Sequence, residues 1–99
     1  MYQKFIITNE GTLRFGQVYL HRDLLHYGED CTYGGGLWKI DHSRNAILLY
    51  GRSFDFGLPD FSQVRHIDWS HFGNLHPILL YAPHWPNEDL LEPVYANNC

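Results

Sequence analysis

Short apolar runs separated by turn-forming residues organise most of this chain. Residues 9–12 and 43–45 have the composition of tight turns, so each predicts a β-hairpin between the runs that flank it. The last run follows Pro77, which suits a strand near a sheet edge. Strands are predicted at residues 4–8, 13–20, 37–41, 46–50 and 78–82.

Two other segments place apolar residues at helical spacing. A short helix is predicted to begin just after His21 and to stop at Gly28, with Asp23 well placed for the positive end of its dipole. A second helix is predicted from Pro59 to about Trp69. Because strands outnumber helices, the pattern predicts an α+β domain with one sheet and two helices.

Length and composition are those of one globular domain. The chain has 99 residues, 44% hydrophobic and 16% aromatic, which is enough for one core and too few for two. We therefore expect residues 1–99 to form a single domain, with residues 83–99 as a loosely packed tail. The formal net charge of −4 disfavours nonspecific binding to nucleic acid.

The sequence lacks the features of membrane and disulfide-rich proteins. Its longest apolar runs are about five residues, far below the roughly 20 that span a bilayer, and its start has no apolar signal core. A cytoplasmic protein without membrane contact is therefore expected. Two cysteines do not make a disulfide framework, so Cys31 is expected to be a reduced, partly buried thiol.

The stretch from Cys31 to Gly57 contains the unusual backbone positions. Three consecutive glycines at 34–36 permit close approach of a ligand, a bulge or a neighbouring element, and these alternatives remain open. The loop at 51–57 is bracketed by glycines and carries Ser53. Such a loop can hold an anion on its backbone N–H groups, or its serine and aspartate can simply stabilise a turn.

Several polar residues together suggest phosphate chemistry. His21 at a helix start would lie beside unpaired N–H groups that favour an anion, and a histidine has a pKa suited to a base near neutrality. With Lys4, Arg14 and the Ser53 loop, the set matches phosphoryl-group hydrolysis, which needs positive charge on the transferring oxygens and a base that orients water. Lys4 on its own also fits a solvated edge-strand lysine.

Ordered motifs between residues 19 and 57 resemble the Janus/Ocnus family, which includes phosphohistidine phosphatases. The resemblance implies an α+β fold, a single compact domain with one mixed β-sheet of about five or six strands flanked by two helices. It also implies metal-independent removal of phosphate from phosphohistidine or a related phosphoramidate, without a cofactor. The motifs are Tyr19-Leu20-His21-Arg22-Asp23-Leu24, Cys31, Gly34-Gly35-Gly36, Tyr50-Gly51-Arg52-Ser53, Phe56-Gly57 and, more weakly, Lys4-Phe5-Ile6-Ile7.

The same resemblance assigns roles to individual residues. His21 matches the catalytic histidine, which we expect to act as general base. Lys4 and Ser53 match phosphate-contacting side chains, and Arg22 and Asp55 match backbone donors. The partner implied is a phosphohistidine-containing protein or a small phosphorylated ligand. The expected phosphate-binding residues are Lys4, Arg22, Ser53 and Asp55, supported by Arg14, Gly34, Gly35, Gly36 and Gly51.

Two departures from the family pattern motivate other hypotheses. Leu37 stands where animal members carry an arginine, and Asp55 places a carboxylate beside the phosphate loop, where it would repel phosphate. One alternative is a catalytically degenerate module that binds a phosphorylated ligand, nucleotide or protein partner. Another is an interaction protein that uses exposed aromatic residues, among them Trp69, Phe72 and Trp85.

Seven histidines raise the question of a metal site. His66, His71 and His76 recur every five residues, which does not place them on one face of a helix. Neither a Cys-x-x-Cys nor a His-Glu-x-x-His spacing is present. No metal site is expected.

Overall fold

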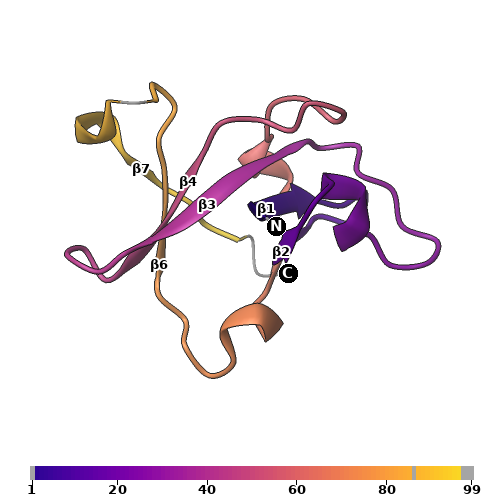
Figure 1. The fold of residues 1–99 in the computed structure, drawn as a ribbon, viewed down its shortest axis with the longest axis horizontal. Helices are drawn as coiled ribbons and strands as arrows, with labels where there is room; N and C mark the ends of the chain where they lie inside the picture. Colours follow the sequence, from indigo (N-terminus) through magenta and orange to yellow (C-terminus); the bar gives the residue numbers. More distant parts are fainter. Residues whose placement is uncertain (1, 86, 97–99) are drawn as a thin grey trace.

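The computed structural model describes residues 2–85 and 87–96, and within them strands are joined by loops and by single turns of 3-10 helix (Figure 1). The strands are β1 (Tyr2–Ile7), β2 (Thr12–Val18), β3 (Gly35–Asp41), β4 (Ala46–Tyr50), β5 (His66–Asp68), β6 (Ile78–Tyr81) and β7 (Glu92–Pro93). The turns are η1 (His21–Leu24), η2 (Phe61–Gln63), η3 (Ser70–Phe72) and η4 (Glu88–Leu90).

One mixed sheet contains these strands in the order β5-β2-β1-β3-β4-β6-β7. The predicted β1–β2 and β3–β4 hairpins are confirmed as antiparallel pairs, and β1 also pairs antiparallel with β3. β5 and β6 join parallel to β2 and β4. The sheet curls, so that the chain after β7 returns towards the β5 edge, where Ala96 shares a shallow depression with Ile67 and Trp69.

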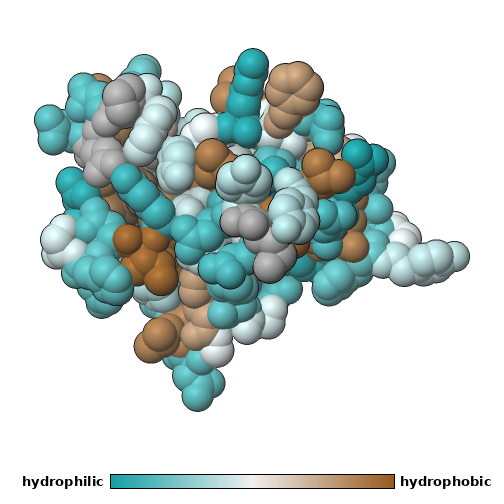
Figure 2. Space-filling model, in the orientation of Figure 1, coloured by the Kyte–Doolittle hydropathy of each residue, from teal (hydrophilic) through white to brown (hydrophobic). Residues whose placement is uncertain are grey.

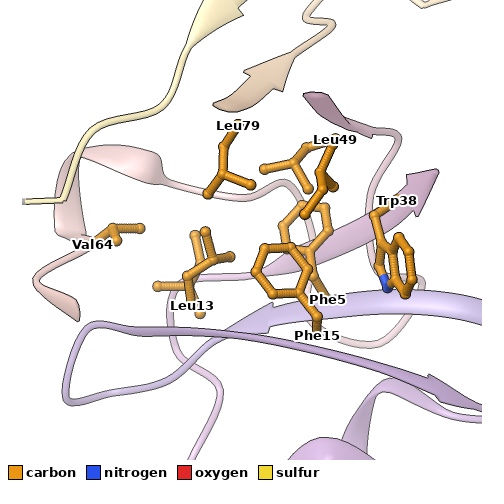
Figure 3. Packing of buried hydrophobic residues seen from close by; sticks show 9 residues of the cluster. Phe5, Leu13, Phe15, Trp38, Leu49, Val64 and Leu79 are labelled. Carbon is orange, nitrogen blue, oxygen red and sulfur yellow. The ribbon is translucent and has the colours of Figure 1, made fainter. Parts of the chain in front are cut away.

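Alternation along the strands directs the large apolar side chains to the inner face of the curled sheet. Phe5 and Phe15 from the first hairpin pack with Trp38 and Leu49 from the second (Figure 3). The Phe15 and Trp38 rings meet edge to face at 6.2 Å between centroids, an arrangement favoured by aromatic quadrupoles. This cluster is the main core.

The outer face of the sheet carries η1. Ile6 packs there with Leu24 and Cys31, and Cys31 is a buried free thiol whose pKa is raised to about 11 by burial. Gly16 allows η1 to lie this close, because a Cβ at Gly16 would stand only 2.5 Å from Leu24 Cδ2. This contact holds His21, the first residue of η1, against the sheet.

The structure contradicts the predicted α+β class with two flanking helices, because neither predicted helix forms. The first segment makes only the turn η1, and Leu25 after it is already extended. In the second segment, β5 pairs with β2, and the N–H groups of Arg65 and His66 both donate to Gly11 O at 2.8 and 3.2 Å. Isolated helices this short are marginal, so bonds to the sheet edge prevail. The sheet also has seven strands within the described residues, rather than five or six.

Part of the segment predicted as a tail belongs to the sheet. β7 pairs antiparallel with β6, and the Val94 N–H donates to Leu79 O at 3.0 Å. Residues 86 and 97–99 of that segment lie outside the described residues. On the face drawn in Figure 2, apolar side chains lie in separate groups among hydrophilic ones. No helix in the described ranges is long and apolar enough to cross a bilayer.

Candidate functional site

A depression of about 260 Å³ on the outer face brings together three parts of the chain that are far apart in sequence. Lys4 comes from β1, His21 from η1, and Arg52 and Asp55 from the loop after β4. We call this depression the anion pocket. Its lining residues are Lys4, Leu20, His21, Leu37, Arg52, Phe54 and Asp55.

His21 is held against the sheet by one hydrogen bond and one missing side chain. Its Nε2 lies 2.8 Å from Gly36 O, and the residue is only 6% exposed. A Cβ at Gly35 would stand 3.2 Å from His21 Cδ2 and 2.4 Å from Phe5 O. Glycine at this position therefore lets the imidazole lie close to β3, which explains one of the three consecutive glycines without a ligand contact.

The hydrogen bond to Gly36 determines which ring nitrogen of His21 is basic. A carbonyl oxygen only accepts, so Nε2 carries the proton and Nδ1 holds the free lone pair in the neutral ring. No described group hydrogen-bonds to Nδ1, and no buried polar atom of the described side chains lacks a partner. Nδ1 is therefore not fully buried and keeps its lone pair free, on a residue that lines the anion pocket.

Burial also keeps His21 neutral near pH 7. Desolvation is the largest cause of its lowered pKa, and the charge of Lys4 lowers the pKa further. The hydrogen bond to Gly36 and the charge of Asp55 act in the opposite direction without reversing the shift. A neutral imidazole with a free lone pair is the form that a general base requires.

The anion pocket carries two cations and one carboxylate. Lys4 Nζ donates to Tyr19 O at 2.5 Å and lies 5.4 Å from the centroid of the Tyr2 ring. These contacts hold the ammonium at the pocket wall. Arg52 and Asp55 line the pocket from the loop and are both exposed. The formal charge of the lining side chains with His21 neutral is +1, from Lys4 and Arg52 against Asp55.

Ser53 is occupied by the architecture of its own loop. Its side chain is buried, and Oγ accepts from the Phe56 N–H at 3.1 Å. Its backbone N–H donates to Gly35 O at 2.9 Å and to Gly57 O at 3.1 Å. These bonds fasten the loop to β3 and so position Arg52 and Asp55. Ser53 itself is not among the pocket-lining residues. Phosphate contact by Ser53 stays a prediction.

The two other expected arginines lie outside the anion pocket lining. Arg14 is buried, and its guanidinium donates to the carboxylates of Glu29 and Asp68 and to Leu24 O. The hydrogen bond from Arg14 is the largest cause that lowers the pKa of Glu29 to about 2. Arg22 is exposed on η1. Arg14 therefore joins η1 and its following loop to β2 and β5, which supports His21 from a distance.

The remaining glycines of the predicted set serve the backbone. Gly34 has φ of +80°, and a Cβ there would stand 2.0 Å from Leu58 O. Gly36 approaches β4 closely, with an added Cβ only 2.6 Å from Tyr50 O. Gly51 opens the loop with φ of +68°. Close packing of the backbone around the anion pocket therefore accounts for glycine at these three positions.

Sequence reasoning missed Arg52 as a functional residue. Arg52 immediately precedes Ser53 in the glycine-bracketed loop, so the loop itself was the available signal. Burial turns the Ser53 side chain inwards, which leaves its neighbours Arg52 and Phe54 on the outside. Leu20 and Leu37 form apolar walls of the pocket. Leu37 was singled out in the sequence only as a departure from the family arginine, and Leu20 only as part of the motif around His21, so neither was expected to line the pocket.

Comparison with known proteins leaves the family open: no family model, no curated protein and no solved structure matches this chain. The likeness to the Janus/Ocnus family therefore stays a prediction carried by its motifs. The two flanking helices that it implied are wrong for this chain. Among the described residues, no group of three or more histidine, cysteine or acidic side chains is arranged to hold a metal ion.

Proposed function

We propose that this chain is a cytoplasmic hydrolase that cleaves a phosphorus–nitrogen bond, as in phosphohistidine or a related phosphoramidate, with His21 as general base. The observation that carries the proposal is the Nε2 contact with Gly36 O at 2.8 Å. It leaves Nδ1 as the basic atom of a residue that lines a pocket with two cations.

In the proposed reaction, Nδ1 of His21 accepts a proton from a water molecule that attacks phosphorus. The new P–O bond forms as the P–N bond breaks, and the leaving nitrogen takes up one proton, which balances the proton that His21 accepted from water and later releases. Lys4 and Arg52 stabilise the charge on the phosphoryl oxygens, which is the main requirement of this reaction class. The apolar walls at Leu20 and Leu37 exclude water from one side and strengthen these contacts.

Turnover of a phosphoramidate and of a phosphohistidine peptide by matched variants tests the proposal. His21→Gln keeps a donor for Gly36 O but removes the base, so its rate should fall at least about a hundredfold. The control His42→Gln changes an exposed histidine in the β3–β4 turn and should have wild-type activity. Equal activity of wild type and His21→Gln, with or without chelator, contradicts the proposal.

Asp55 favours a second candidate, a module that binds a phosphorylated ligand without hydrolysing it. Its carboxylate lines the same pocket and opposes a dianionic transition state. Under this alternative, wild type hydrolyses nothing but binds phosphate compounds in calorimetry. Binding should then weaken about tenfold or more in Lys4→Met and Arg52→Met, because each loses a charge-assisted contact.

A further inference from the structure

A second depression of about 400 Å³ adjoins the anion pocket, and the two share Leu37 as a common wall. Its other lining residues are Tyr2, Gln3, Gln17, Trp38 and Tyr50. We call it the ring pocket. A ligand that fills both depressions must therefore pass over Leu37.

The ring pocket exists because β3 separates from β1. Pairing of β1 with β3 ends at Lys4↔Leu37, whereas β1 stays paired with β2 as far as Tyr2↔Val18. The Trp38 indole N–H donates to Lys4 O at 3.1 Å and to Gly16 O at 3.2 Å at this point of divergence. The edge of the gap is thus held by hydrogen bonds from the Trp38 side chain to backbone carbonyls of β1 and β2, and it is not a loop that can simply close.

Strand register places an aromatic ring at a defined distance from the cation of the anion pocket. Lys4 pairs with Leu37, and Leu37 pairs with Tyr50, so the three lie side by side across β1, β3 and β4. Adjacent strands are about 4.8 Å apart, which puts the Lys4 and Tyr50 backbones about 10 Å apart. A phosphoryl group and a flat ring must be separated by a spacer to occupy both positions.

One aromatic wall of the ring pocket is held in place by stacking. Tyr50 stacks on Trp85 with 4.4 Å between centroids and 21° between planes, and Lys39 Nζ lies 4.9 Å from the Trp85 centroid. Tyr2 stands on the β1 side and is 63% exposed. The Gln3 and Gln17 amides also line this pocket, and each offers a donor and an acceptor. This combination of stacking faces and amides suits a nucleobase.

We infer that the two pockets together take a nucleoside 5′-phosphoramidate, in which ribose is the spacer between the phosphoryl group and the base. The inference rests on the proposed function for the cleaved bond. Phosphohistidine bonds its imidazole directly to phosphorus, so that ring cannot reach the ring pocket while the phosphoryl group lies at Lys4. Charge also favours a nucleoside phosphoramidate. The lining charge of +1 matches its single negative charge better than it matches the two negative charges of phosphohistidine.

The reaction is balanced without a further reactant. Water adds to phosphorus, the P–N bond breaks, and the products are a nucleoside monophosphate and an amine. The base of the product remains in the ring pocket while the phosphate lies at Lys4 and Arg52. Product inhibition by a nucleoside monophosphate is therefore expected, and it should exceed inhibition by ribose 5-phosphate.

The test compares adenosine 5′-phosphoramidate, inorganic phosphoramidate and a phosphohistidine peptide as substrates of the full chain. Wild type should prefer the adenosine compound at least about tenfold in kcat/KM, and Tyr2→Ser and Tyr50→Leu should each reduce that preference about fivefold or more by removing a stacking face. Tyr27→Ser is the control, because this exposed tyrosine lies outside both pocket linings. Equal kcat/KM for the three substrates, or an equal loss in Tyr27→Ser, overturns the inference while leaving the proposed hydrolase intact.

Binding of adenosine 5′-monophosphate separates this inference from the proposed function. In calorimetry, wild type and His21→Gln should both bind it more tightly than ribose 5-phosphate, and Tyr2→Ser should remove the difference. If this pattern appears without turnover of any substrate, the hydrolase proposal fails and the nucleotide site stands. If the monophosphate and ribose 5-phosphate bind alike in wild type, the nucleotide site is refuted.

Discussion

Replacing Glu29 with glutamine should destabilise the protein, because it breaks the ion pair that joins η1 and its following loop to the sheet. Arg14 donates Nη1 and Nη2 to the two Glu29 carboxylate oxygens at 2.5 and 3.0 Å. Its Nε donates to Asp68 on β5 at 3.2 Å, and Nη1 also donates to Leu24 O at 3.0 Å. The Arg14 and Glu29 side chains are only 10% and 13% exposed, so water offers little replacement.

The pKa of Glu29 gives the magnitude of this effect. Folding lowers it from 4.5 to about 2, and the hydrogen bond from Arg14 is the largest cause. One pKa unit corresponds to about 1.4 kcal/mol, so the whole shift corresponds to about 3 kcal/mol. Solvent screening of the exposed part reduces the expected loss in Glu29→Gln to about 2 kcal/mol. Arg14→Met should cost about 3–5 kcal/mol, because it leaves two carboxylates unpaired.

Urea unfolding at pH 7 and pH 3 measures how much Glu29→Gln lowers the free energy of unfolding, and in which direction this loss changes with pH. Because folding lowers the pKa of Glu29, its contribution is complete above pH 4.5 and declines as the pH falls towards 2. The difference between wild type and Glu29→Gln should therefore shrink at pH 3. The exposed Glu10→Gln is the matched control and should change stability little at either pH. Equal stabilities of wild type and Glu29→Gln at pH 7, or a difference that does not depend on pH, would refute the ion-pair account.

Three further predictions concern the anion pocket. The acid limb of kcat/KM should lie below pH 6.5, because burial lowers the pKa of His21, and a limb above that value contradicts the assignment of the base. Ser53→Ala should cost about 1 kcal/mol in urea unfolding through its lost bond to the Phe56 N–H, with kcat/KM within about threefold of wild type; a hundredfold loss of activity would instead indicate phosphate contact. Gly35→Ala should cost about 2 kcal/mol or more and reduce kcat, because its Cβ would meet Phe5 O and His21; unchanged thermal stability and kcat would show that the strand tolerates the methyl group.

Hairpins were the part of the fold that could be predicted from the chain. The β1–β2 and β3–β4 pairs follow from local alternation and from the turns at 9–12 and 43–45, and both form as expected. The two helices were wrong, because apolar spacing cannot show that β5 finds hydrogen-bond partners on β2, residues 12–14. Parallel pairing between distant strands has no local signature in sequence.

The residues of the site also divide into those that could be predicted from the sequence and those that only folding places there. His21 and Lys4 could be named from the sequence, because histidine and lysine carry their chemistry wherever the chain places them, and both line the anion pocket. Arg14 was equally suited by residue type, but folding pairs it with Glu29 and Asp68. Arg52 enters the pocket only because the buried Ser53 turns the loop, which is a packing effect.

The sequence by itself determined which segments form the two hairpins, where the backbone needs glycine, and which side chains can serve as base and cation. These properties depend on residues close together in the chain. Tertiary structure alone decided that Gly36 O selects Nδ1 of His21 as the basic atom, and that Lys4, Leu37 and Tyr50 stand in one row. Such relations depend on strand register, which is set by packing between residues far apart in the chain.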